Sequence, residues 1–134
     1  MQPLFVYGTL LFPEVLKMLL GRIPRRAKAV LTGYRRCSIH DGPSIRLYPA
    51  IFPEEQAVVE GELLLDLSAA ERQVLDAYEG ADYLKVQVQV YAEGQSRQAE
   101  AYVWQMGKRG QLRGDWDPEY FKTHHLQSYL GHLS

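Results

Sequence analysis

The stretch Phe5–Leu11, FVYGTLL, decides how the fold begins. The apolar run from Leu4 to Tyr7 predicts a short buried strand, and Gly8, Thr9 and two leucines follow it. A tight turn at Gly8 would explain this ending, because glycine adopts backbone conformations that are closed to other residues. A pocket in which backbone N–H groups meet a small ligand would explain it as well. The stretch alone leaves both interpretations open.

The composition is typical of a globular protein. The 134 residues are 46% hydrophobic and 23% charged, so we expect one domain, residues 1–134, with a real core. There are 15 Lys and Arg against 16 Asp and Glu, and the formal net charge of −1 gives no electrostatic case for nucleic acid or an anionic membrane as partner. The pairs Arg25-Arg26 and Arg35-Arg36 are explained as well by a solvated strand face as by a phosphate site.

The sequence predicts a cytoplasmic protein. No cationic segment precedes the first apolar stretch, as a signal peptide would require. No apolar run approaches the roughly 20 residues of a membrane helix. The single cysteine, Cys37, cannot form an internal disulfide, and its position in an alternating apolar run is typical of an unreactive buried thiol.

End signals predict three helices. Pro13 suits a first helical turn and Gly21 ends the segment, so one helix is predicted over residues 13–20. The clearest helix is SAAERQVLDAYEG, residues 68–80. Ser68 and Glu71 form its capping box. Val74, Leu75 and Tyr78 form its apolar stripe, and Gly80 is its terminal glycine. A last helix is predicted over residues 117–130, because Asp-Pro-Glu is a typical helix start.

Alternating and apolar runs predict the strands. These are residues 4–7, 27–40 with a bend at Gly33, 48–51, 58–67, 83–91 and 98–104. Pro49 places the short third segment at an edge or a bend. Gly61 in the fourth indicates a bulge or a close neighbour. The last two form a hairpin, and this order of elements predicts an α+β fold whose mixed or antiparallel sheet can curl into a barrel.

Most familiar catalytic motifs do not match the chain. None of the four histidines is spaced from another like a helical zinc pair, and no second cysteine or carboxylate cluster supports a metal site. There is no G-x-S-x-G elbow and no P-loop. The segment GKRGQLRG, residues 107–114, lacks dinucleotide-binding spacing. We interpret it as a mobile basic loop, with a phosphate site as the weaker alternative.

Glu79 has an unusual position for an acidic residue. At 100° per residue it lies about 40° from Leu75 around the helix, so its side chain points with the apolar stripe. It also stands at the helix C-terminus, where the macrodipole disfavours a negative charge. Burial and dipole both raise a carboxyl pKa toward neutrality, which suits a general base. Alternatively, Glu79 frays into solvent beside Gly80 or pairs with Lys85 or an arginine.

Two motifs stand in a characteristic order. The first, Tyr7-Gly8-Thr9-Leu10, follows the first predicted strand, and the second, LDAYEG at Leu75–Gly80, is followed by Tyr83. Together with the intermediate segments they resemble the γ-glutamylcyclotransferase-like superfamily, most closely its AIG2-like branch, over nearly the whole chain. The first motif departs from the family's usual Y-G-S-L at Thr9, which keeps the hydroxyl and adds a methyl group.

This resemblance implies a small mixed, mostly antiparallel β-barrel with flanking helices. It also implies that a γ-glutamyl group of a small substrate is cyclised to 5-oxoproline, that an amine or amino acid is released, and that no metal or organic cofactor is needed. Glu79 is then the general base and acid. Tyr7, Gly8, Thr9 and Leu10 form the substrate-binding loop, whose backbone N–H groups hold a carboxylate or the developing oxyanion.

Several questions stay open at this level. A shared fold does not secure activity, so a non-catalytic small-molecule-binding module with the same cavity is the alternative function. The leaving group is open among γ-glutamyl amino acids, γ-glutamyl-ε-lysine, glutathione and carrier-linked glutamyl groups, and so is the oligomeric state. Position alone suggests that residues 107–114, Trp104, Trp116 and Tyr120 rim the pocket, and packing of these aromatics against the barrel is an equal alternative.

Overall fold

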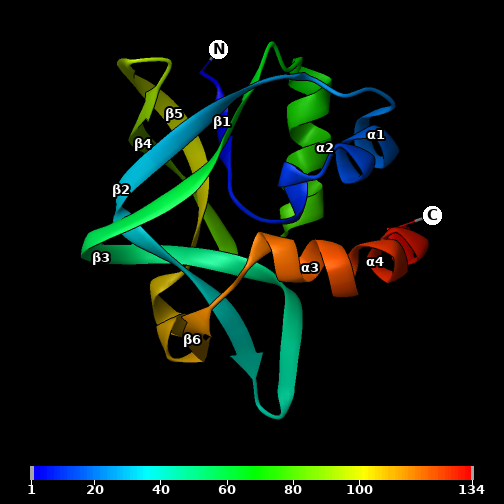
Figure 1. Cartoon of the computed structure of the whole chain (residues 1–134), viewed down its shortest axis with the longest axis vertical. Coiled ribbons are helices and arrows are strands. Elements are labelled where there is room, and N and C mark those ends of the chain that lie inside the picture. Colours follow the sequence, from blue (N-terminus) through cyan, green and yellow to red (C-terminus); the bar gives the residue numbers. More distant parts are fainter. Residues whose placement is uncertain (1, 134) are drawn as a thin grey trace.

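A closed five-stranded barrel forms the centre of the protein (Figure 1). The computed structural model describes residues 2–133. The strands are β1 (Leu4–Val6), β2 (Arg25–Asp41), β3 (Ser44–Leu65), β4 (Tyr83–Ala92), β5 (Gln95–Trp104) and β6 (Leu112–Asp115). Their order is β3-β1-β5-β4-β2-β6, and β2 pairs back onto β3 to close the barrel. Within the described chain β1 and β5 pair in parallel and the other pairs are antiparallel, which confirms the predicted fold class.

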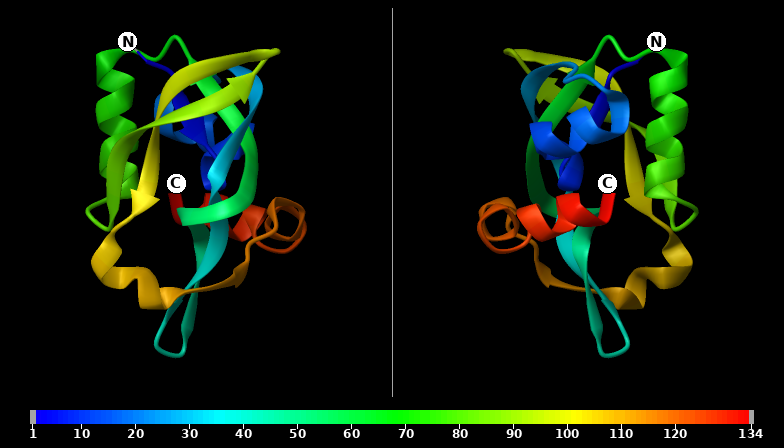
Figure 2. Two further views of the ribbon diagram at one scale, coloured as in Figure 1. Left: turned by 90° about the vertical axis from the view of Figure 1, so that its left-hand side faces the viewer. Right: turned by 90° about the vertical axis from the view of Figure 1, so that its right-hand side faces the viewer.

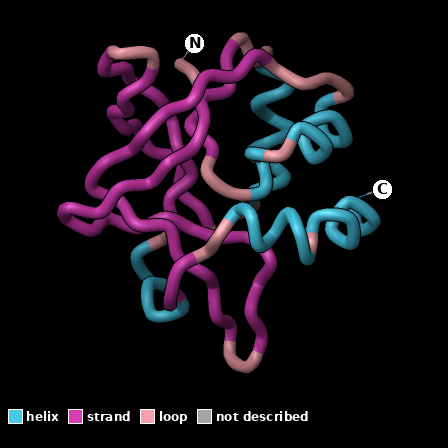
Figure 3. Tube along the Cα trace, in the orientation of Figure 1, coloured by secondary structure: helices cyan, strands magenta, loops and turns pink. Residues whose placement is uncertain are grey.

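The α-helices lie on one side of the barrel (Figures 1 and 3). The 3-10 helix that immediately precedes β6 lies away from them. The helical elements are η1 (Thr9–Leu11), α1 (Pro13–Leu20), α2 (Ala69–Glu79), η2 (Met106–Gln111), α3 (Pro118–His124) and α4 (Leu126–Leu133). The bounds of α1 match the prediction, and so does the reciprocal capping box of Ser68 and Glu71. Across residues 2–133, no helix has the length and apolar character needed to cross a membrane.

The strand β3 is longer than predicted. Residues 48–51 and most of 58–67 belong to one 22-residue strand, which pairs with β2 along most of its length. Residues 48–51 do lie at an edge, since the described strands offer them no neighbour other than β2. Pro49 has no backbone N–H to donate, but no second strand beside it requires that hydrogen bond, so the strand continues through the proline.

Residues 107–114 form regular structure instead of a mobile loop. They supply most of η2 and of β6, and β6 pairs with the outer part of β2. The segment is fixed through its basic side chains, because Lys108 Nζ lies 2.6 Å from Asp82 and Arg109 stacks 4.5 Å over the Phe52 ring. Lys108 and Arg109 are thus engaged by neighbouring parts of the fold, which the glycine-rich sequence does not reveal.

Two helix predictions need correction. The last helix is broken at His125, where φ is −129°, so that α3 and α4 are separate helices. Val74 lies outside the buried stripe of α2 with 40% of its surface exposed, whereas Leu75 is fully buried. The stripe is narrow because the C-terminal part of α2 contacts the barrel chiefly through Leu75 and Tyr78.

Alternation along β1 divides the core into two clusters, and this division positions the site. Phe5 and Tyr7 belong to the cluster inside the barrel, and Leu4 and Val6 to the cluster between the barrel and the helices. Helices α1 to α4 all contribute residues to the second cluster. In the right-hand view of Figure 2 these helices lie in front of the barrel. The loop that leaves β1 therefore lies where the barrel and the helical layer meet.

Candidate functional site

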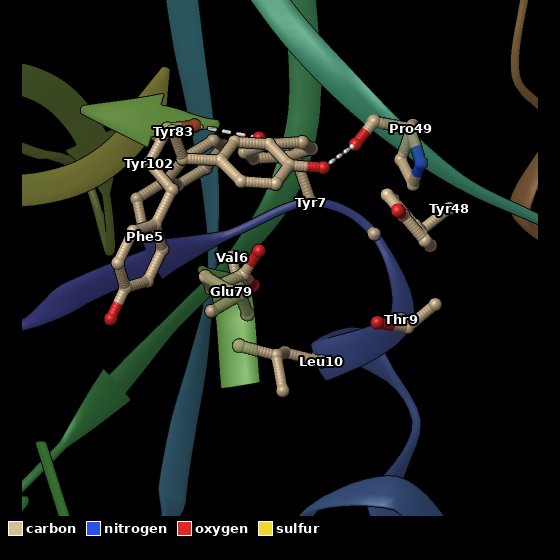
Figure 4. A pocket seen from close by; sticks show the side chains of 11 residues that line it. Phe5, Val6, Tyr7, Thr9, Leu10, Tyr48, Pro49, Glu79, Tyr83 and Tyr102 are labelled. Carbon is tan, nitrogen blue, oxygen red and sulfur yellow. Dashed lines mark hydrogen bonds between the residues drawn. The ribbon is translucent and has the colours of Figure 1, made fainter. Parts of the chain in front are cut away.

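The loop after β1 forms one wall of a cavity (Figure 4). The cavity itself has a volume of about 20 Å³, and the space counted together with its open mouth is about 300 Å³. It is lined by Phe5, Val6, Tyr7, Gly8, Thr9, Leu10, Tyr48, Pro49, Glu79, Tyr83 and Tyr102. A Cβ atom at Gly8 would lie 2.8 Å from the Pro49 ring, so glycine is required by the close approach of loop and strand β3. All five residues predicted for the site, Tyr7 to Leu10 and Glu79, line this one cavity.

Glu79 reaches the cavity from the end of α2. Neither a hydrogen bond nor an ion pair joins its carboxylate to any other residue of 2–133, and Lys85 pairs instead with Asp76 at 3.2 Å. Burial raises the pKa of Glu79 to about 8. The predicted rise in pKa is confirmed, and the alternative pairing with Lys85 is wrong. A partly buried carboxylate without a partner costs stability, which makes a purely structural role a poor explanation.

Four tyrosines surround the carboxylate in the cavity: Tyr7, Tyr48, Tyr83 and Tyr102. Three hydroxyls donate to protein acceptors, from Tyr7 to the Tyr102 carbonyl (2.6 Å), from Tyr83 to the Pro49 carbonyl (2.7 Å) and from Tyr102 to the Asp76 carboxylate (2.6 Å). Burial raises the pKa of these three phenols, and the Glu79 charge adds to the rise. They therefore stay neutral and hold the shape of the cavity.

The charges of the lining limit what the cavity can bind. Among its lining residues Glu79 is the one acid, and no arginine, lysine or histidine is present. A ligand ammonium is therefore the natural partner of Glu79, whereas an anionic ligand group depends on neutral donors. Thr9 and Leu10 begin η1, so their backbone N–H groups lack acceptors within that helix and are suited to this task.

Metal ligation finds no support in the described part of the chain. Within residues 2–133 no group of three or more His, Cys, Asp and Glu side chains is placed to hold a metal ion. Cys37 is 8% exposed, and burial raises the pKa of its thiol, so it carries the features of the unreactive strand cysteine that the sequence predicts.

The aromatics proposed for the pocket rim lie elsewhere. Trp104 and Trp116 belong to the core cluster between barrel and helices, where they are 1% and 8% exposed. Tyr120 is 58% exposed on α3. None of the three lines the cavity, and neither does any residue of 107–114. The rim hypothesis is therefore wrong, and packing against the barrel is confirmed for the two tryptophans.

Arg36 supports the Tyr7–Leu10 loop from outside the cavity, and the sequence did not distinguish it from its neighbour Arg35. Its guanidinium donates to three backbone carbonyls, those of Tyr7 (2.9 Å), Trp116 (3.2 Å) and Glu60 (3.2 Å). It also lies 5.7 Å from the Trp116 ring, and burial lowers its pKa. Arg36 thereby fixes the carbonyl immediately before Gly8. The alternating pattern of β2 indicates that adjacent arginines face opposite ways but not which one turns inward.

Replacing Arg36 by Lys is expected to destabilise the protein by about 2 kcal/mol in urea unfolding. A lysine cannot donate to three separated carbonyls, so it leaves partly buried acceptors unpaired. Arg35→Lys is the matched control, because Arg35 makes exposed ion pairs with Glu54 and Asp115. The loss of stability in Arg35→Lys should be clearly smaller than that in Arg36→Lys, because solvent screens exposed ion pairs. Equal losses in the two variants would contradict the positioning role of Arg36.

Fold and site together define a class of protein: a mixed five-stranded barrel with one acid-bearing, tyrosine-lined cavity beside its first strand. Residues 4–118 match the family described as gamma-glutamyl cyclotransferase, AIG2-like, so the chain belongs to this family. It is similar to two Arabidopsis thaliana proteins. AIG2-like protein D is 36% identical over 133 residues (97% of this chain, 85% of the relative), and AIG2-like protein C is 35% identical over 129 residues (95% and 73%).

Two solved structures share the fold. The solution structure of an Arabidopsis thaliana protein matches with a TM-score of 0.73 at 29% identity, over 98% of this chain and 87% of that chain. A structure named gamma-glutamyl cyclotransferase matches with a TM-score of 0.64 at 17% identity, over 98% and 85%. The resemblance inferred from the two sequence motifs is thus confirmed at the level of family and fold.

Proposed function

We propose that the protein is a γ-glutamylcyclotransferase that converts the γ-glutamyl group of a small γ-glutamyl-amine or γ-glutamyl-amino acid to 5-oxoproline. Glu79 is the general base and acid, and the Tyr7–Leu10 loop binds the glutamyl group. The observation that carries the proposal is the unpaired Glu79 carboxylate, with a pKa of about 8, in the cavity bounded by this loop. Membership of the gamma-glutamyl cyclotransferase, AIG2-like family adds independent support.

The first chemical step uses the pKa of Glu79. An α-ammonium group has a pKa near 8, so a carboxylate with a similar pKa exchanges a proton with it at little cost. Loss of this proton frees the α-nitrogen to attack the γ-carbonyl carbon of the same molecule. Nucleophile and electrophile belong to one substrate, so a cavity that holds it folded supplies much of the rate enhancement.

The second step breaks the γ-amide. Attack forms the ring C–N bond and places a negative charge on the γ-carbonyl oxygen, which the backbone N–H groups of Thr9 and Leu10 are suited to stabilise. Glu79 then passes a proton to the leaving nitrogen as its C–N bond breaks. It takes the second proton from the ring nitrogen and passes it to the released amine, which departs as an ammonium. Over the whole reaction the α-ammonium loses two protons and the leaving nitrogen gains two, so no co-reactant is required.

The proposal is tested by 5-oxoproline release from a panel of γ-glutamyl compounds. The panel contains γ-glutamyl amino acids, γ-glutamyl-ε-lysine and glutathione, so it also identifies the leaving group. Release from at least one compound is expected. A protein that binds panel members in a thermal-shift assay without releasing 5-oxoproline would instead be the non-catalytic binding module that shares this fold.

The pH dependence of kcat/KM gives a sharper prediction. Because the base must be ionised and its pKa is about 8, kcat/KM should rise about tenfold per pH unit from pH 5.5 and level off near pH 8. Below pH 8 the substrate is mainly in its α-ammonium form, so the rise of kcat/KM with pH reports the ionisation of Glu79 in the free enzyme. A flat profile between pH 5.5 and 7.5 would contradict Glu79 as the base.

A further inference from the structure

Three hydroxyl groups from three helical elements meet beside the cavity. Thr9 Oγ1 in η1 lies 2.7 Å from the hydroxyl of Tyr78 in α2, and the Tyr78 hydroxyl is hydrogen-bonded to that of Tyr129 in α4. Thr9 is only 5% exposed, and both tyrosines are partly buried. Helix α4 supplies no residue of the cavity lining, so it is connected to the site through this network.

The number of protons in the network limits how it can be arranged. Burial raises the pKa of Tyr78 and of Tyr129, and the Glu79 charge adds to both rises, so each hydroxyl keeps its proton. The two hydrogen bonds, Thr9–Tyr78 and Tyr78–Tyr129, use two of the three hydroxyl hydrogens, and either oxygen of each pair can be the donor. A further contact between Thr9 and Tyr129 acts to lower the pKa of Tyr129, against the larger effect of burial, and competes with a ligand for the third hydrogen. If donation runs from Tyr129 to Tyr78 to Thr9, the Thr9 hydrogen is left over at the cavity. If it runs the other way, Thr9 presents only lone pairs.

We propose that Tyr129 is a positioning residue: it donates to Tyr78, Tyr78 donates to Thr9, and the Thr9 hydroxyl is left to donate its hydrogen to an oxygen of the bound ligand. Hydrogen bonds that run in one direction polarise one another, so the Thr9 donor is strengthened by the two tyrosines behind it. Helix α4 thereby completes the donor set. The identification of that oxygen as the γ-carbonyl oxygen rests on the proposed cyclotransferase function.

Steady-state kinetics of Tyr129→Phe test the proposal, because the variant removes one hydroxyl and keeps the ring. We expect a loss of about tenfold in kcat/KM, carried mainly by kcat, since the Thr9 hydrogen bond strengthens as charge develops on the oxygen. Tyr78→Phe should lose a similar factor. Tyr91→Phe is the matched control, because Tyr91 is 59% exposed on β4 and its hydroxyl should not affect either constant.

The double variant Thr9→Val with Tyr129→Phe separates positioning from a structural role. If Tyr129 acts through Thr9, the double variant is no slower than Thr9→Val alone. Losses that multiply, or an unchanged kcat/KM in Tyr129→Phe, would overturn the proposal. A fall in melting temperature alone, with kcat and KM unchanged, would do the same, since it indicates a structural contact.

A test that does not depend on enzyme activity separates the hydroxyl network from the proposed cyclotransferase function. If the wild type releases no 5-oxoproline from any panel compound, the proposed function fails, and the network is then tested by urea unfolding. The midpoint loss of the double variant should be smaller than the sum of the two single losses, because all three hydroxyls share one network. Additive losses would overturn the proposal even when the protein is inactive.

Discussion

Glu79→Gln is expected to lower kcat for 5-oxoproline release by about 10²–10⁴-fold. Glutamine keeps the size and polarity of the side chain, but it can neither take the proton from the α-ammonium nor return one to the leaving nitrogen. Binding should weaken less than turnover, because the carboxylate that pairs with the ligand ammonium is lost but the loop at Tyr7–Leu10 and the tyrosine walls are untouched. KM should therefore change much less than kcat, and the acid limb of the pH profile should disappear.

The same substitution is expected to stabilise the fold. The pKa of Glu79 is raised from an ordinary value near 4.5 to about 8, so unfolding lets the carboxyl ionise more easily. The wild type therefore loses stability as the pH rises from about 4.5 to 8, and Glu79→Gln removes this loss. At pH 7 the gain should be about 3 kcal/mol, and it should vanish near pH 4.

Denaturant unfolding at pH 4 and pH 7 measures this gain. Glu55→Gln is the control, because Glu55 is an exposed residue of β3 and its replacement should change neither stability nor kcat. An active Glu79→Gln enzyme would remove Glu79 from the mechanism. If the stability difference between Glu79→Gln and the wild type is the same at pH 4 and pH 7, the carboxylate is solvated in the free protein.

Features that are determined within a few residues were predictable. The start of α1 at Pro13 and the capping box of Ser68 and Glu71 depend on neighbours in the sequence, and both are confirmed. The side of the helix on which Glu79 lies was predictable for the same reason, because the helical angle places it with Leu75. Burial on that side raises its pKa, whereas the predicted contribution of the helix dipole is not tested. Local signals thus identified the acid of the site before its surroundings were known.

Features that depend on distant partners were not predictable. The length of β3 is set by its pairing with β2, and a proline that would break an isolated strand is accommodated at an edge. Tyr48 and Tyr102 come from different strands, and only the closed barrel brings them to Glu79. Arg36 differs from Arg35 through the side of β2 that it faces, which its residue type does not reveal.

Gly61→Ala is expected to be the most destabilising single-methyl change that the structure identifies. A Cβ atom at Gly61 would lie 2.2 Å from the Val6 carbonyl oxygen and 2.8 Å from the Phe5 ring, so the backbone of β1 must shift. The sequence prediction of a close neighbour at this glycine is confirmed. Overpacking against backbone should cost about 3 kcal/mol or more in urea unfolding, or prevent folding altogether.

The matched control for this change is Gly107→Ala, where a Cβ atom meets nothing within 4 Å, and its stability should stay within about 1 kcal/mol of the wild type. Because Val6 immediately precedes the Tyr7–Leu10 loop, any Gly61→Ala protein that folds must also displace this loop, which we propose binds the glutamyl group. It should therefore show a raised KM in addition to its lower unfolding midpoint. A variant with wild-type stability and KM would mean that β1 can move away from β3 without disturbing the site, and that the junction of barrel and loop is not rigid.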